Sequence, residues 1–349
     1  MLSYRESISI QKDAGTSEYF RMNENSPLVQ LLVALSRREY RFCTVTPATH
    51  HRVMLKRTAL SADLRDIFGW NMPFVVDALP TDIAKPMCDA GIIRIANGLA
   101  TSTVRVASLD SDLFLHSSYP TVDPQAVFFG PDTYRFARFI TSAIECLPDC
   151  ELSPDSLSLR PVRILDVGCG SGAGGIVAAR AIRAKGFSVE LVLSDINPEA
   201  LVMTKANALA ANLEVICALG DTLSAVDGEF DFIISNPPYL YDDAERIYRH
   251  GGERLGRALS VRIAAESLKR LASNGRLLLY TGVAMVDECD PLLTELFPML
   301  DDADYAWTYD EIDPDVFGEE LDRPIYDGAH RIAAIGLVVH YRSPIKNVF

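Results

Sequence analysis

The stretch Arg163-Ile164-Leu165-Asp166-Val167-Gly168-Cys169-Gly170-Ser171-Gly172-Ala173-Gly174-Gly175 decides the fold of this 349-residue chain. A short apolar run ends in closely spaced glycines, and an alanine-rich run follows, which predicts a strand, a tight turn and a helix. Glycines at 168, 170 and 172 let the backbone approach a ligand closely, and the start of a helix favours negative charge on that ligand. The stretch therefore predicts a nucleotide-cofactor loop.

Short apolar runs alternate with helical stretches from this loop to the C-terminal end. The predicted strands are residues 163–167, 189–193, 213–218, 230–235, 275–280 and 333–340. Such alternation predicts an α/β domain with a mostly parallel sheet and helices on both faces.

The residues before the loop have a different pattern. Apolar residues recur at helical spacing from Pro27 to Phe74, and residues 92–95 and 102–107 predict a β-hairpin with its turn at Asn97-Gly98. Since the chain is longer than a usual single core, we expect two domains. Residues 1–125 would form a smaller α+β domain, resembling a winged helix, that recognises the substrate or partner. Residues 126–349 would form the catalytic domain.

The charge is unevenly distributed along the chain. Residues 1–130 carry 13 basic and 13 acidic residues, so the remaining residues carry the whole net charge of −14. This acidity disfavours contact between the C-terminal part and the phosphates of a nucleic acid. Residues 37–65 are an exception, because their arginines and lysine predict either a solvated helical face or a basic surface for RNA or DNA.

A second charged segment lies near the C-terminal end. From Asp287 to Asp322 there are fourteen Asp or Glu residues and no Lys or Arg, with aromatic residues between them. We interpret residues 287–322 as a solvated acidic insertion in the catalytic domain.

Several kinds of protein are disfavoured by what the sequence lacks. No run of about 18 apolar residues and no signal-peptide pattern is present, so we expect a cytoplasmic protein without a membrane partner. The seven cysteines are scattered, which is typical of reduced thiols. Cys146 and Cys150 have no second Cys/His pair, so we expect no metal site.

Asp166 points to the chemistry of the cofactor. Gly170, Gly172 and Gly175 also fit the glycine spacing of dinucleotide-binding loops, so the glycines alone leave a dinucleotide open. An acidic residue two positions before Gly168, however, suits a cofactor with an ammonium group better than one with a pyrophosphate. S-adenosylmethionine carries such a group.

Two further strand ends carry carboxylates for the same cofactor. Asp195, followed by Ile196, ends the second strand, where it can accept hydrogen bonds from both hydroxyls of a ribose. Asp221, followed by Thr222, ends the third strand, where it can accept from an adenine amino group. An ordinary turn remains the alternative for Asp221.

Asn236-Pro237-Pro238-Tyr239 follows the fourth strand and predicts the reaction. Two prolines end the strand abruptly and leave the Asn236 amide and the Pro237 carbonyl free to face a crevice. Together they offer two acceptors for one NH₂ group, while Tyr239 offers a flat face for stacking. These four residues are therefore the predicted catalytic residues for methylation of a planar nitrogen.

With Asp166, the three glycines, Asp195, Gly220-Asp221-Thr222 and Asn236-Pro237-Pro238-Tyr239 in this order, residues 128–282 resemble class I S-adenosylmethionine-dependent methyltransferases, most closely the HemK/PrmC group. Phe129-Gly130-Pro131-Asp132-Thr133 is similar to a Pro-Arg-Pro-Asp-Thr-Glu motif of that group, although Gly130 replaces the Arg. The resemblance implies a Rossmann-like seven-stranded domain, S-adenosylmethionine as cofactor, and a protein glutamine as methyl acceptor.

Other acceptors stay open. Related enzymes with the same tetrapeptide methylate adenine N6 or guanine N2 of nucleic acids, and a small-molecule amine or amide is a third possibility. A non-catalytic binding module and an NAD-dependent oxidoreductase are disfavoured, because the methyltransferase motifs are intact and no acid for hydride transfer accompanies the glycine loop.

Overall fold

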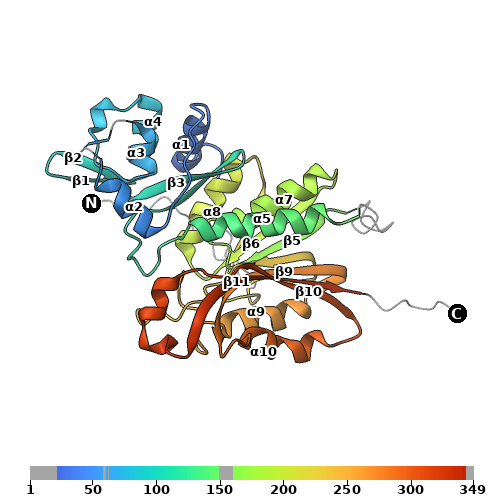
Figure 1. Cartoon of the computed structure of the whole chain (residues 1–349). Coiled ribbons are helices and arrows are strands. Elements are labelled where there is room, and N and C mark those ends of the chain that lie inside the picture. The colour runs from blue at the N-terminus through green and yellow to red at the C-terminus, as the bar shows by residue number, and fades with distance from the viewer. Residues whose placement is uncertain (1–21, 58–59, 62, 149–159, 343–349) are drawn as a thin grey trace.

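The computed structural model of the chain describes residues 22–57, 60–61, 63–148 and 160–342. A seven-stranded sheet in the order β10-β11-β9-β8-β5-β6-β7 forms its centre (Figure 1). Its strands are β5 (Val162–Val167), β6 (Val189–Asp195), β7 (Val215–Leu219), β8 (Phe230–Ser235), β9 (Leu271–Val286), β10 (Tyr305–Asp313) and β11 (Ala329–Tyr341). Strands β5 to β9 pair in parallel, whereas β11 is antiparallel to both β9 and β10. The predicted Rossmann-like, seven-stranded α/β fold is thereby confirmed.

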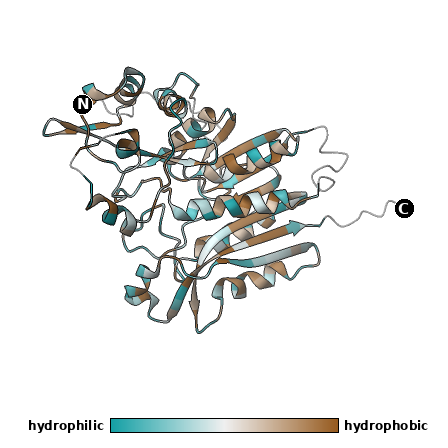
Figure 2. Cartoon of the chain, turned by 45° about the horizontal axis from the view of Figure 1, so that its top comes forward, coloured by the Kyte–Doolittle hydropathy of each residue, from teal (hydrophilic) through white to brown (hydrophobic). Residues whose placement is uncertain are grey.

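Helices cover both faces of this sheet. On one face lie α5 (Pro131–Glu145), α7 (Ala173–Ala184) and α8 (Pro198–Ala210), and on the other lie α9 (Ala258–Leu268) and α10 (Pro291–Leu300) (Figure 1). Successive side chains of a strand point to opposite faces, so Ile164 and Ile234 pack under the first layer, and Leu165 and Ile233 under the second. Figure 2 shows the hydrophobic residues along these central strands.

The structure corrects the interpretation of residues 287–322 as a solvated insertion, because the segment contributes a helix and the edge strand of the sheet. It contains α10 and the edge strand β10, which pairs with β11 along its length. Tyr305, Trp307 and Tyr309 pack against the core, while Thr308 and Asp310 between and beyond them are exposed. This alternation is that of a strand with one buried face. Beyond β10, two short 3₁₀ turns follow, η4 (Gly318–Asp322) and η5 (Pro324–Tyr326).

The N-terminal part contains helices and two β-hairpins, where the sequence predicted helices and one hairpin. Its elements are α1 (Pro27–Ser36), α2 (Pro47–Met54), α3 (Leu64–Phe68), η2 (Val76–Ala78), α4 (Thr81–Asp89), β1 (Ile93–Ala96), β2 (Leu99–Ser102), β3 (Val104–Leu109) and β4 (Asp112–Ser117). The hairpin turn at Asn97-Gly98 is correct, since both residues have positive φ. The predicted partner strand was wrong. A two-residue turn forces pairing to start at Leu99, so β2 pairs with β1, and β3 pairs with β4 instead.

The N-terminal elements pack on α8. Val202 and Ala206 of α8 belong to the same apolar cluster as the buried side chains of α1 and β4. Asn207 of α8, 1% exposed, accepts from Leu115 N at 2.8 Å and donates to Leu115 O at 3.2 Å. A boundary between residues 125 and 126, and a likeness to a winged helix, stay predictions.

Candidate functional site

The glycine loop joins β5 to α7 as predicted. Gly168, Gly170 and Gly172 all have positive φ, at 67°, 53° and 77°. Nothing lies within 4 Å of a Cβ placed at Gly168 or Gly170, and both residues line the main pocket. Gly172 differs, because it begins α7 and a Cβ there would meet Thr204 Oγ1 at 2.9 Å. The first two glycines thus form the open cradle, while the third permits close packing on α8.

Asp166 is a buried carboxylate at the floor of this pocket. It is 1% exposed, and its Oδ2 accepts from Gly175 N at 2.8 Å. Burial raises the pKa of Asp166 to about 7, the hydrogen bond from Gly175 opposes this, and the nearby Asp195 adds to it. Among the described residues, none donates to Oδ1. A positively charged ligand would therefore meet a carboxylate that lacks a cationic partner.

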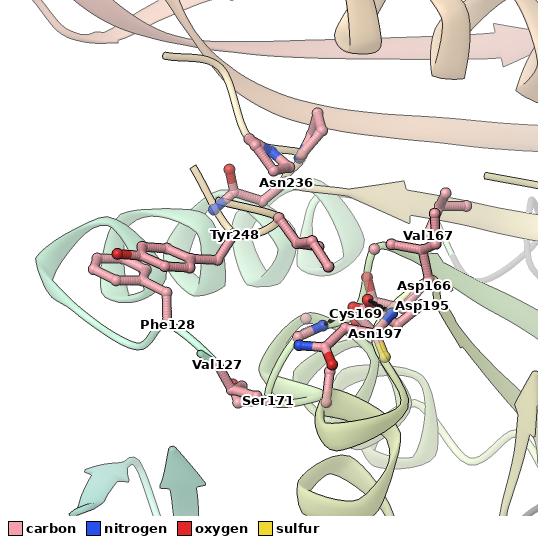
Figure 3. Close-up of a pocket in the computed structure, with 18 of the residues that line it drawn as sticks. Val127, Phe128, Asp166, Val167, Cys169, Ser171, Asp195, Asn197, Asn236 and Tyr248 are labelled. Atoms are coloured by element: carbon pink, nitrogen blue, oxygen red, sulfur yellow. Dashed lines mark hydrogen bonds between the residues drawn. The ribbon is translucent and has the colours of Figure 1, made fainter. Parts of the chain in front are cut away.

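Asp195 ends β6 beside Asp166 (Figure 3). Its Oδ2 accepts from Gly170 N and its Oδ1 from Asn197 N, each at 2.8 Å. Burial raises the pKa of Asp195, and these backbone hydrogen bonds lower it. Each oxygen keeps a second acceptor position, and the contact with ribose hydroxyls stays a prediction. The structure adds a role that the sequence did not predict, because Asp195 ties the glycine loop to the next strand. Ile196 also lines the pocket and is 53% exposed.

Asp221 and Thr222 line the same pocket but are held by α9. Asp221 Oδ2 accepts from Arg262 Nη2 at 2.7 Å, and Thr222 Oγ1 donates to Glu266 Oε2 at 2.6 Å. The predicted contact between Asp221 and an adenine amino group stays a prediction. Arg262 already occupies one oxygen of that carboxylate.

The Asn-Pro-Pro-Tyr segment leaves β8 and reaches the opposite end of the pocket. Asn236, Pro237 and Pro238 line the pocket, and Asn236 Nδ2 donates to Asp132 Oδ2 at 3.2 Å. Among the described residues, no donor reaches Asn236 Oδ1 or the Pro237 carbonyl. Two hydrogen-bond acceptors are therefore available at this end of the pocket.

Tyr239 lies in a second cavity that adjoins the first. Its side chain is 7% exposed, and its ring covers Gly282 of β9, where a Cβ would come within 2.2 Å of Tyr239 Cε2. Phe317 contacts the ring edge-on at 5.9 Å between centroids. Stacking of an acceptor on Tyr239 stays a prediction, and the packing leaves little of the ring accessible.

Phe128 and Tyr248 belong to the site but were not predicted from the sequence. Both line both cavities, and their rings are nearly parallel, 6.3 Å apart between centroids, on the Asn236 side of the pocket (Figure 3). Tyr248 is anchored, since its hydroxyl donates to Thr121 O at 2.7 Å. Gly130 was the sequence signal that could have indicated Phe128, because a Cβ at residue 130 would lie 2.5 Å from the Phe128 ring. The departure from the Arg of the HemK/PrmC motif therefore makes room for Phe128.

None of the described residues of the basic stretch 37–65 lines this pocket. Arg38, Arg57 and Arg65 pair with Asp82, Asp66 and Asp63, respectively. Arg37, Arg41, Arg52 and Lys56 are exposed, and no carboxylate of the described residues forms an ion pair with them. Arg52 lies on α2 and Lys56 just after it.

His50 is part of the link from α2 to the pocket. It is 4% exposed, and its ring lies 4.1 Å from that of Tyr119 between centroids, tilted by 32°. Burial, with the charge of Arg105, lowers the pKa of His50 to about 4. From Tyr119 the chain continues to Ala126, Val127 and Phe128, which line the pocket.

The chain is similar to known methyltransferases. Residues 155–301 match the family model of the methyltransferase small domain. A release factor glutamine methyltransferase of Koribacter versatilis is 31% identical over 179 residues, which are 46% of this chain and 58% of that protein. A ribosomal RNA small subunit methyltransferase C of Sodalis glossinidius is 40% identical over 77 residues, 22% of this chain and 21% of that protein. This chain thus spans less than two thirds of the length of either relative.

Among solved structures, a SAM-dependent methyltransferase from Agrobacterium tumefaciens is 15% identical, with a TM-score of 0.44 over 70% of this chain and 71% of that one. The family match, the sheet and the glycine loop define a class I S-adenosylmethionine-dependent methyltransferase domain. Within that class, the relatives make it HemK/PrmC-like.

The residues present fit S-adenosylmethionine as the cofactor. The open cradle at Gly168 and Gly170 admits a ligand against the backbone, and the free oxygen of Asp166 suits an ammonium group. The groups of three or more His, Cys, Asp or Glu that could hold a metal ion are absent among the described residues. Within the described part of the chain, no helix combines the length and apolarity needed to cross a membrane.

Proposed function

We propose that this protein is an N-methyltransferase that modifies the side-chain amide nitrogen of a glutamine in a protein. The observation that carries the proposal is the orientation of Asn236. Its NH₂ group is turned toward Asp132, so its Oδ1 and the neighbouring Pro237 carbonyl are left as two acceptors at the end of the cofactor pocket.

Two acceptors favour a planar NH₂ group as the substrate. S-adenosylmethionine supplies an activated methyl group, so the residues of this chain mainly need to place the nitrogen in line with it. An amide lone pair is delocalised and poorly nucleophilic. Hydrogen bonds from both N–H groups to Asn236 and Pro237 favour the geometry in which the lone pair leaves conjugation, and they are strongest in the transition state.

A glutamine is the preferred acceptor because of the relatives and the charge. Two release factor glutamine methyltransferases match 46% and 50% of the chain and a third matches 22%, whereas the ribosomal RNA enzymes match between 22% and 34%. The acidity of the C-terminal part also disfavours phosphates close to the pocket. We assign recognition of the protein partner to residues 1–125.

A nucleic-acid base is the second candidate. The exposed cations on α2 support it, because α2 is joined through His50 and Tyr119 to the segment that lines the pocket. The rings of Phe128 and Tyr248 also suit a flat acceptor.

The test is transfer of labelled methyl from S-adenosylmethionine to a cell extract, followed by digestion of the product with protease or nuclease. We expect protease-sensitive label. Asn236→Ala should lower the rate on the order of 10²–10³ by analogy with loss of one oxyanion-hole donor, with cofactor binding unchanged by calorimetry. Nuclease-sensitive label would exchange the first candidate for the second. An Asn236→Ala variant with more than half the activity would contradict the placement of the acceptor.

A further inference from the structure

Asp132 is a buried carboxylate at the start of α5. It is the second residue of α5, 4% exposed, and is held between two side chains from the sheet. Tyr280 of β9 donates to its Oδ1 at 2.6 Å, and Asn236 donates to its Oδ2 at 3.2 Å. Asp132 thus joins the start of α5 to the residue at the end of β8 that faces the methyl acceptor.

The orientation of the Asn236 amide depends on what its NH₂ group meets. A rotation of 180° about the last side-chain bond would exchange oxygen and nitrogen and aim a donor at the incoming NH₂ group. An ionised carboxylate accepts hydrogen bonds only, so it stabilises the orientation with NH₂ toward Asp132 and disfavours the reverse one. If that orientation is fixed before the substrate binds, the Asn236 oxygen already faces the NH₂ group that is to be methylated.

We infer that Asp132 is a positioning residue, held in place by Tyr280, that fixes the side-chain orientation of Asn236 for methyl transfer. This inference rests on the proposed N-methyl transfer but holds for either acceptor. Asp132 acts through Asn236 rather than on the reacting nitrogen.

The surroundings of Asp132 shift its pKa in both directions. Burial raises its pKa, while hydrogen bonds from Tyr280 and Asn236, the nearby Tyr239 hydroxyl and the Arg135 guanidinium lower it. Arg135 is itself paired with Asp313 at 2.8 Å. The N-terminus of α5 adds a favourable dipole for a negative charge. Burial has the largest effect, so the pKa of Asp132 is raised overall, while these hydrogen bonds and the helix N-terminus stabilise its ionised form.

The side-chain amide of Asn236 gives a readout that needs no activity. In ¹⁵N-labelled protein, we expect one Nδ2 proton to be shifted downfield and protected from exchange, and Asp132→Asn to abolish both effects. Asp231→Asn is the matched control, because Asp231 is also buried, is the second residue of the strand β8 that leads to Asn236, and accepts instead from Arg160 at 2.6 Å. That variant should leave the Asn236 signals in place.

The second readout is the rate of methyl transfer to the fraction of the cell extract that accepts labelled methyl. We expect Asp132→Asn to lower kcat on the order of 10²-fold with the KM for S-adenosylmethionine within about twofold. Tyr280→Phe, which keeps the carboxylate, should lower kcat about tenfold, as expected for one hydrogen bond. A folded Asp132→Asn variant with unchanged Asn236 signals would overturn the inference. If the amide signals depend on Asp132 but no acceptor is methylated by the natural protein, the proposed function fails while the orientation by Asp132 stands.

Discussion

At the scale of single residues, Asp166 couples cofactor binding to pH. Its pKa is raised to about 7 in the folded protein, mainly by burial. A cofactor ammonium needs the ionised form, so we expect the dissociation constant of S-adenosylmethionine to rise about tenfold for each pH unit below about 7. Calorimetric titration with S-adenosylmethionine between about pH 5.5 and 8 measures this dependence.

Asp166→Asn keeps the shape of the side chain and removes the titration. Its affinity should be low throughout and nearly independent of pH, whereas a parallel pH dependence in this variant would assign the effect to another group. Without cofactor, the stability of the folded protein should depend on pH in the opposite direction. Because the folded state binds the Asp166 proton more tightly than the unfolded state, the free energy of unfolding should increase as the pH falls from about 7.

At the scale of elements, α2 decides between the two candidate acceptors. Arg52 and Lys56 are exposed, and the described residues supply no carboxylate for them. If α2 binds nucleic acid, reversing both charges to Glu should reduce the slope of log K against log salt by about two, since each phosphate contact contributes roughly 0.9. Filter binding of total cellular RNA to the full chain measures this slope.

Arg65→Glu is the matched control for α2. Arg65 is 64% exposed and paired with Asp63, so its reversal should change the slope little. Under the preferred proposal, the natural protein binds RNA weakly and the double variant has no further effect.

The elements also show how far the sequence could be interpreted. The strands that carry Asp166, Asp195 and Asn236 were predictable, because fully buried parallel strands are continuous apolar runs. β10 was mistaken for an insertion because an edge strand has an exposed side that accepts charge. The recurrence of aromatic residues at every second position, Tyr305, Trp307 and Tyr309, was the sequence signal for it.

Contacts between distant segments explain what could not be predicted in the site. Phe128 and Tyr248 are far apart in the sequence and come together only in the folded chain, so no local sequence pattern predicts their parallel rings. The bonds from Gly170 and Asn197 to Asp195 depend on backbone geometry that only the turn defines.

At the scale of the whole molecule, α8 joins the N-terminal elements to the catalytic sheet. Asn207 binds the backbone of Leu115 in β4 and also donates to Ser171 O of the glycine loop at 2.9 Å. Asn207→Ala should cost about 1–3 kcal/mol, because buried backbone groups lose their partner. Both parts should unfold in one transition, since they share α8.

The two tryptophans of the chain allow this to be measured. Trp70 lies in the N-terminal part and Trp307 in β10, so Trp70→Phe and Trp307→Phe each leave one fluorescent reporter. Urea midpoints from the two reporters should coincide and should fall together in Asn207→Ala. Separate midpoints in the otherwise natural chain would show that the two parts unfold independently.

The edge position of β10 has a consequence for self-association. An unpaired strand edge is a template on which another copy can add a strand, and charged side chains oppose this. Asp310 and Glu311 are exposed on β10, in a chain with an isoelectric point near 4.9. Replacing both by Asn and Gln should promote aggregation, measured by light scattering, and the natural protein should aggregate as the pH approaches 4.9. In that case Asp310 and Glu311 keep copies of the protein apart.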